Sequence, residues 1–386
     1  MSAEEPDVVF LTDGGQDANV AGERIVSFIE GARRTLELAI YDAHFDNDLG
    51  PRAPVRPDAS HLTGRILGAL DAAEQRGVVV RAIYNDPDGP GSLLAARPTS
   101  REDTRVARPT IEPRVGPSFL QRLSQCVPAR PIDGRFDLMH HKYVVRDADD
   151  HETAAVLTGS ANWTTDSFTR MENAILTIPN RGLAQTYRLD FEQLWPKRNV
   201  ENSGKIDDEP DTLAYRGTEM AVRALFSPGR GRKMSQLIAR RIGEAKRRVR
   251  ICSPVLTSTP ILGTVAEVLH DAVVDTTVTV DGSQMRQVLR QWSEDGRAAW
   301  KGPLYNHVKT SGRLAEKQST PYAPNSLHDF MHAKMVVADD WVLTGSFNCS
   351  HSGEQNAENL VEMHNSAMAD RFVAFIDSVH TRYSHS

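Results

Sequence analysis

Two stretches of this chain follow the same pattern, MHHKYVVRD at positions 139–147 and MHAKMVVAD at positions 331–339. The apolar run after each lysine is typical of a buried β-strand. Side chains two residues apart on a strand point to the same face, so His140 pairs with Lys142 and His332 with Lys334. The sequence therefore predicts two imidazole–ammonium pairs, one in each half of the chain.

A second shared pattern follows each stretch, LTGSAN at 157–162 and LTGSFN at 343–348. A glutamate then stands 12 residues after each motif serine. An imidazole that attacks or transfers a proton needs one ring nitrogen free and the other held by an acceptor, so these glutamates are predicted to orient the histidines. A lone histidine or Gly-Ser-x-Asn turn is ordinary, but two complete sets favour a functional site. The two sets are His140, Lys142, Asp147, Ser160, Asn162 and Glu172, and His332, Lys334, Asp339, Ser346, Asn348 and Glu358.

The surroundings of the motifs are duplicated as well. In each half a helix, a strand, a helix and a strand precede the motif strands, and a further helix closes the half. This alternation predicts an α/β fold in which each half is a mixed, mostly parallel sheet flanked by helices. We expect a first half at 1–195, a polar linker at 196–216 and a second half at 217–386. The predicted helices are 21–32, 62–76, 182–195, 234–245, 261–270 and 367–383. The strands that alternate with them along the chain are 35–41, 78–84, 249–255 and 276–280.

Length and composition permit a large core, since 40% of the 386 residues are hydrophobic. The net charge of −6 argues against coating nucleic acid, but not against a locally positive cleft. Three scattered cysteines are too few for a disulfide framework or a zinc site. No apolar signal core opens the chain, and no run approaches the ~20 apolar residues needed to cross a bilayer. We expect a soluble, cytoplasmic protein without stable membrane insertion, or a secreted one if a signal peptide has been removed.

A metal site is the main alternative for the paired histidines. Each histidine shares its strand face with a lysine, whose ammonium group would repel a cation and suits an anionic oxygen instead. We therefore expect neither a metal nor another cofactor.

Together, the His-x-Lys-x4-Asp and Gly-Ser-x-Asn motifs resemble those of the phospholipase D superfamily, which includes phospholipases D, cardiolipin and phosphatidylserine synthases and several metal-independent nucleases. The resemblance covers both halves and implies two similar α/β halves related by a pseudo-twofold, with the active site at their junction. A monomer would then hold a complete site. The interval from the motif aspartate to the glycine departs from the family, with 11 residues at 148–158 and five at 340–344. The longer interval is predicted to be a longer hairpin tip.

The resemblance implies phosphodiester chemistry through a covalent intermediate. His140 would attack phosphorus to form a phosphohistidine, as the first-copy histidine usually does in the family, although the near symmetry of the motifs does not itself choose between the two. His332 would protonate the leaving oxygen and then activate water or an alcohol, which predicts a bell-shaped pH dependence. The remaining roles are oxygen binding by Lys142, Lys334, Asn162 and Asn348, support by Ser160 and Ser346, and structural hydrogen bonding by Asp147 and Asp339.

The phosphodiester substrate stays open between two classes. Phospholipase D-type hydrolysis or head-group transfer on phospholipids is the leading prediction, although no clear amphipathic surface helix supports it. A metal-independent nuclease is the alternative, because GSANWT and GSFNCS, each followed by Glu-Asn, resemble the nuclease branch. Trp300, Tyr305 and Tyr322 would stack bases, line a lipid pocket or, by default, simply pack. The segments that would choose the substrate, 86–131 and 296–325, match no recognisable pattern.

Overall fold

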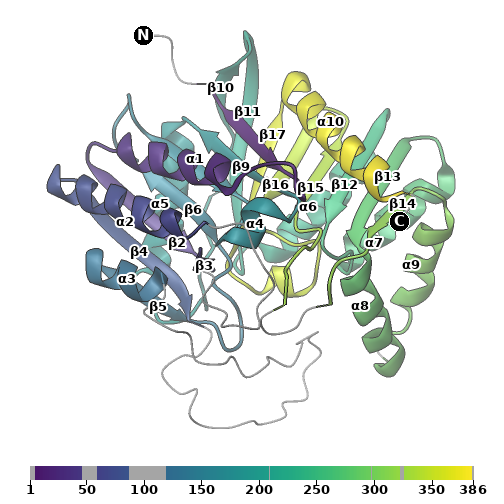
Figure 1. The fold of residues 1–386 in the computed structure, drawn as a ribbon. Helices are drawn as coiled ribbons and strands as arrows, with labels where there is room; N and C mark the ends of the chain where they lie inside the picture. Colours follow the sequence, from purple (N-terminus) through teal and green to yellow (C-terminus); the bar gives the residue numbers. More distant parts are fainter. Residues whose placement is uncertain are drawn as a thin grey trace.

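The computed structural model describes residues 5–45, 59–86, 119–207, 209–296, 298–321 and 326–384. In this part of the chain two mixed β-sheets share a central core, and helices lie between them and on their outer faces (Figure 1). The purple-to-teal first half supplies one sheet, and the green-to-yellow second half, with a teal edge, supplies the other.

The first sheet has the strand order β1-β9-β7-β6-β2-β4-β5. A separate short parallel pair consists of β3 (Ala43–His44) and β8 (Trp163–Thr164). The strands of the large sheet are β1 (Asp7–Leu11), β2 (Thr35–Ile40), β4 (Val79–Asp86), β5 (Ala129–Asp133), β6 (Lys142–Arg146), β7 (Ala155–Gly159) and β9 (Asn173–Ile178).

The second sheet repeats this order with one strand added at an edge, β10-β11-β17-β16-β15-β12-β13-β14. Read position by position, β11 stands where β1 stands in the first sheet, β17 where β9 stands, and so on to β14 and β5. The same spatial order in both sheets confirms the predicted duplication. The strands are β10 (Asp211–Tyr215), β11 (Thr218–Ser227), β12 (Arg248–Ser253), β13 (Asp275–Asp281), β14 (Leu314–Lys317), β15 (Met335–Ala338), β16 (Trp341–Gly345) and β17 (Glu358–His364).

Both sheets are mixed, as predicted, but the expected majority of parallel pairs is wrong. Parallel pairing is found where helices intervene, among β2, β4 and β5 and among β12, β13 and β14. The other neighbouring pairs, including all that join motif strands, are antiparallel. For β6–β7, β10–β11 and β15–β16 the reason is the connection length, because strands joined by a short turn can pair only in the antiparallel sense. The 11-residue interval forms the longer hairpin that the sequence predicts, since β6 ends at Arg146 and β7 begins at Ala155.

Helices form three layers around the two sheets (Figure 1). Apolar side chains of α1, α2 and α3 pack on the outer face of the first sheet, and those of α6 to α9 pack on the outer face of the second. Helices α5 and α10 lie between the sheets. The helices are α1 (Ala18–Glu30), α2 (Ser60–Gln75), α3 (Phe119–Cys126), α4 (Thr165–Thr169), α5 (Arg181–Leu194), α6 (Gly231–Glu244), α7 (Thr259–Asp271), α8 (Gly282–Glu294), α9 (Lys301–Thr310) and α10 (Ser366–Tyr383), with a 3₁₀ turn at Ser352–Glu354.

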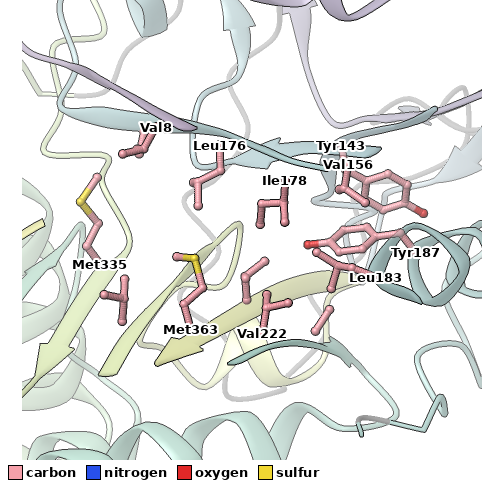
Figure 2. Close-up of a cluster of buried hydrophobic side chains, with 14 of the residues drawn as sticks. Val8, Tyr143, Val156, Leu176, Ile178, Leu183, Tyr187, Val222, Met335 and Met363 are labelled. Carbon is pink, nitrogen blue, oxygen red and sulfur yellow. The ribbon is translucent and has the colours of Figure 1, made fainter. Parts of the chain in front are cut away.

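The central core joins the two halves of the chain. Figure 2 shows Leu176 and Ile178 of β9 facing Met363 of β17 and Val222 of β11. Tyr187 of α5 belongs to the same cluster and is fully buried. Since burial of apolar surface is the main favourable term in folding, this shared core ties the two sheets together.

The ten helices and strands expected from the sequence are present close to their predicted bounds. The boundaries of the halves stay a prediction, and within the range 196–216 Asp211–Tyr215 forms β10. Tyr305 is buried and its hydroxyl donates to Glu316 at 2.9 Å, so it packs, whereas Trp300 is half exposed. Tyr322 and most of the segment 86–131 lie outside the described residues. No helix in the described ranges has the length and apolar character to span a membrane.

Candidate active site

The two motif histidines lie where the halves of the chain meet. His140 precedes β6 and His332 closely precedes β15. The residue before each histidine makes an isolated parallel bridge to the other half, at the residue just before β17 or β9. Each histidine is thereby held against the opposite repeat, so the site is built across the junction. The bridges join Met139 to Ala357 and Met331 to Glu172.

His140 is held through its ring nitrogen Nδ1 by Glu358 Oε2, at 2.6 Å. Both side chains are buried, and the Tyr41 ring stands edge-on to the imidazole at 4.5 Å. Burial, followed by the charges of Lys142 and Lys334, lowers the pKa of His140 well below its usual value. Burial raises the pKa of Glu358 to about 7. Glu358, one of the two glutamates predicted to orient the histidines, thus holds the histidine of the other half, and this contact leaves Nε2 of His140 for chemistry.

His332 is held by an asparagine that the sequence interpretation missed. Its Nδ1 lies 3.0 Å from Oδ1 of Asn173, a fully buried residue at the start of β9. Glu172, the other glutamate predicted to orient a histidine, instead accepts from Lys317 Nζ at 2.8 Å and from the Tyr383 hydroxyl at 2.5 Å. The prediction that Glu172 orients one of the motif histidines is therefore wrong. Glu172 forms part of a buried ion pair between the halves.

The cause is a difference of one residue in strand register. Gly159 of β7 pairs with Ile175, 16 residues later, whereas Gly345 of β16 pairs with Leu360, 15 residues later. Counting back two residues from each partner shows that Asn173 occupies the place in the first sheet that Glu358 occupies in the second. Equal spacing from the motif serines matched Glu358 with Glu172, which is the neighbour of Asn173. The strand register shows that Asn173 is the structural equivalent of Glu358.

The motif glycines allow the strands to approach at the site. Gly159 has a φ of +152° and Gly345 a φ of +145°, in the region that L side chains rarely adopt. A Cβ atom would lie 2.1 Å from the Ala174 carbonyl oxygen in the first copy and 2.5 Å from that of Asn359 in the second. A glycine is therefore required at both positions.

The motif serines brace the partners of the histidines. The Ser160 hydroxyl donates to Asn173 Oδ1 at 2.8 Å, and the Ser346 side chain hydrogen-bonds Glu358. The structure thus places these serines against the side chains that hold the imidazoles, and their expected support of oxygen binding stays a prediction.

The motif lysines are buried beside the histidines. Lys142 Nζ donates to the His140 carbonyl at 2.7 Å, and Lys334 Nζ donates to the His332 carbonyl at 2.6 Å. Burial lowers the pKa of Lys142 to about 7 and, together with repulsion from Lys142, lowers the pKa of Lys334 well below its usual value. Such groups gain most from an incoming anion, because an opposite charge favours the ammonium form.

Asn162 and Asn348 occupy matching positions, one directly before β8 and the other just after β16. Both are partly exposed, and each has a buried amide oxygen without a hydrogen-bond partner. A buried acceptor left in this state costs about 1–3 kcal/mol. The repetition in both copies is consistent with a hydrogen-bond donor that binds there, and contact of the amide NH₂ groups with a phosphoryl oxygen stays a prediction.

Asp147 and Asp339 stand outside the site and hold turns. The Asp147 carboxylate accepts from the backbone N–H groups of residues 33, 34 and 35 at 2.7–2.8 Å. The Asp339 carboxylate accepts from those of residues 246, 247 and 248 at 2.8–3.1 Å. Both aspartates have a positive φ, 49° and 53°. Their contacts are those of a structural role.

The site brings together two imidazoles fixed through Nδ1 and two buried ammonium groups. Within the described ranges, no group of three or more His, Cys, Asp or Glu side chains is arranged to hold a metal ion. The arrangement can offer an uncharged nitrogen nucleophile and a proton carrier to an anionic substrate.

Comparisons with solved structures agree with this fold. A phosphatidylserine synthase from Haemophilus influenzae superposes with a TM-score of 0.62 at 13% identity, over 99% of this chain and 87% of that one. A polyphosphate kinase from Porphyromonas gingivalis superposes with a TM-score of 0.52 at 13% identity, over 97% of this chain and 50% of that one. At such identities the likeness concerns the fold alone.

Comparisons of sequence identify the family. A mitochondrial cardiolipin hydrolase from Xenopus laevis is 39% identical over 57 residues, a match that spans 15% of this chain and 25% of that protein. The family model described as "Cardiolipin synthase, PLD-like domain" matches residues 55–195 and again 238–379, which is well over half of the chain. The second match falls on the half that carries His332 and Lys334. With both repeats matched, this chain belongs to the phospholipase D superfamily, a family of phospholipid-metabolising and related phosphodiester enzymes.

Proposed function

We propose that the protein is a phospholipid phosphodiesterase that hydrolyses or exchanges head groups through a phosphohistidine on His140. The observation that carries the proposal is the pair of histidines fixed through Nδ1 beside two buried lysines. A phosphodiester is anionic and repels anionic nucleophiles, so a neutral imidazole is a suitable attacking group. The family model, described for cardiolipin synthase, supports a phospholipid as the substrate.

The reaction has two steps. Nε2 of His140 attacks phosphorus, the bond from phosphorus to the leaving oxygen breaks, and His332 gives its proton to that oxygen. His332 then takes a proton from water or an alcohol, whose oxygen attacks phosphorus and releases His140. Water gives hydrolysis, and an alcohol gives head-group transfer. Non-bridging oxygens are bound in both steps by Lys142 and Lys334, with the amides of Asn162 and Asn348.

The pKa directions fit this sequence of steps. His140 must begin neutral, and burial beside two lysines holds its pKa low. His332 must begin protonated, although burial and the same lysines also lower its pKa. The substrate's negative charge opposes that effect, so protonation of His332 is favoured when a phosphodiester binds.

A panel of substrates in EDTA tests the proposal. Phosphatidylglycerol, cardiolipin and phosphatidylcholine vesicles are compared with single- and double-stranded DNA and with RNA. We expect EDTA-resistant head-group release, and added glycerol should divert part of the product to a transfer product. Cleavage of nucleic acid without head-group release would instead assign the nuclease alternative.

Two histidine variants test the covalent step. In His332→Ala a substrate with a p-nitrophenolate leaving group, which departs without a proton, should phosphorylate the enzyme and then stall, because no base activates water. In His140→Ala no phosphorylated enzyme should form. His351→Ala, at an exposed histidine, is the matched control and should behave as the wild type. Turnover that survives in His140→Ala would rule out the mechanism.

A further inference from the structure

We propose that Asn173 is the positioning residue of His332, and that the unequal partners divide the labour: His140, backed by Glu358, carries the phosphoryl group, and His332, backed by Asn173, carries the proton. The inference rests on the proposed function and deepens it. The two sequence motifs are nearly identical, so the motifs themselves do not distinguish the two histidines.

The hydrogen bonds of Asn173 fix the orientation of its amide. Nδ2 donates to the Ser167 carbonyl and to the Ser167 hydroxyl, both at 3.1 Å. A carbonyl can only accept, so the NH₂ end must face Ser167. Oδ1 then faces the site, where it accepts from the Ser160 hydroxyl at 2.8 Å and lies 3.0 Å from Nδ1 of His332. His332 must donate through Nδ1, which leaves Nε2 as its reactive nitrogen.

A carboxylate partner suits the histidine that becomes phosphorylated. When Nε2 of His140 bonds to phosphorus, Nδ1 keeps its proton and the ring gains positive charge. The Glu358 carboxylate, 2.6 Å from Nδ1, lies where it opposes that charge as it develops. This stabilisation acts in the covalent step, whatever group leaves.

An amide partner suits the histidine that must release a proton. A neutral amide fixes the tautomer and direction of the ring but does not hold the imidazolium as a carboxylate would. His332 is also partly exposed, unlike His140, so water or an alcohol can reach it. Each partner therefore matches the step that its histidine performs.

The charged surroundings of His332 make the partner's charge decisive. The groups with the largest electrostatic effect on His332 are Lys334, Lys142, His140 and His328, and each disfavours its protonation. A carboxylate placed at Nδ1 would be in direct contact with the ring. Its introduction should therefore be visible in the pH dependence of the reaction.

Asn173→Asp is the first test, with kcat/KM measured across pH. We expect the alkaline limb to move up by about one pH unit, because a contacting opposite charge favours the protonated ring. The control is Asn199→Asp, which adds the same charge at an exposed residue and keeps the side-chain acceptor for the Glu201 N–H. An unmoved alkaline limb in Asn173→Asp, or an equal displacement of the limb in Asn199→Asp, would overturn the proposal.

A second variant covers the case in which Asn173→Asp folds poorly, since its carboxylate would face the Ser167 carbonyl. Asn173→Ala is assayed on an alkyl phosphodiester, whose leaving oxygen needs a proton, and on a p-nitrophenyl phosphodiester, whose leaving group does not. We expect a loss of kcat at least about tenfold greater on the alkyl substrate. Glu358→Gln should lose similar factors on both, because charge develops on His140 with either leaving group.

If Asn173→Ala lost the same factor in kcat on both substrates, the inference would be overturned. The proposed function would still stand, because the wild type turns both substrates over. A wild type that cleaves neither substrate, nor any phosphodiester of the panel, would overturn both.

Discussion

Lys142 and Lys334 are ammonium groups that folding has removed from water. Within the described residues their ammonium groups contact backbone carbonyls and, for Lys142, the face of the Tyr41 ring at 4.6 Å. Isolated burial of a charge is costly, and the usual outcome is a shifted pKa. The site without substrate thus holds lysines that are ready to take up protons together with an anion.

This state predicts proton uptake on anion binding. At pH 8 most of Lys142 is deprotonated, because burial places its pKa at about 7. A bound sulfate raises that pKa, so the protein should take up protons from the buffer, and calorimetry in buffers of different ionisation enthalpy measures the number. Lys142→Gln should reduce the uptake, whereas Lys309→Gln, at a half-exposed lysine, should not. Binding without proton uptake at pH 8 would contradict the assignment.

The residues of the site were predictable to different degrees. Both His-x-Lys pairs and Glu358 were found because a period of two places side chains on one strand face and because the motif is repeated. Asn173 was missed because sequence spacing does not report register, and a shift of one residue exchanges the side chain that faces the site. In the structure, the residues bridged by Met139 and Met331 directly precede Glu358 and Asn173, so these two residues occupy equivalent places.

Among the elements, the turns held by Asp147 and Asp339 explain why each motif ends in aspartate. Each carboxylate takes three backbone N–H groups at the start of β2 or β12 while its own residue adopts a positive φ. Aspartate and asparagine tolerate that conformation better than other residues with a side chain. The aspartate thus fixes the motif strand, β6 or β15, to the neighbouring β2 or β12.

Asp339→Asn should therefore cost stability. It keeps a residue that tolerates the positive φ but removes one of the two acceptor oxygens, and we expect a loss of about 1–3 kcal/mol in the free energy of unfolding. Burial raises the pKa of Asp339, but the backbone N–H groups outweigh it and the net pKa is lowered. The stabilisation is hence present above the pKa of the unfolded state and is lost as pH falls through the folded value.

Urea denaturation at pH 7 and at pH 3 measures both effects. The difference between wild type and Asp339→Asn should shrink at the lower pH. Asp370→Asn, at an exposed carboxylate paired with Arg248, is the control and should change stability by about 1 kcal/mol or less. Equal losses in the two variants would show that the turn contacts carry no special weight.

Several elements escaped prediction for identifiable reasons. Helix α9 begins Lys301-Gly-Pro, which is typical of a turn, yet proline is tolerated in the first turn of a helix because its missing N–H has no helical partner there. A majority of parallel strand pairs was expected from the alternation of helices and strands. The short turns between β6 and β7 and between β15 and β16 instead impose antiparallel pairing on the motif strands.

Across the whole molecule, the two halves share their core and exchange their active-site partners. The His140–Glu358 and His332–Asn173 contacts each join one half to the other. The Lys317–Glu172 ion pair does the same, with both side chains buried. Through these reciprocal contacts and the apolar cluster in Figure 2, each half buries its inner face against the other half.

The shared core predicts that the halves unfold together. Glu172→Gln leaves the buried Lys317 ammonium without this partner, and breaking a buried pair from one side costs about 3–5 kcal/mol. Because Glu172 lies in the first half and Lys317 in the second, hydrogen exchange under native conditions should show reduced protection of both β6 and β15 by the same free energy. Asp149→Asn, which removes an exposed pair with Arg188, should leave protection nearly unchanged. If only one sheet lost protection in Glu172→Gln, the halves would be independent folding units, and the active site between them would depend on docking of two stable domains.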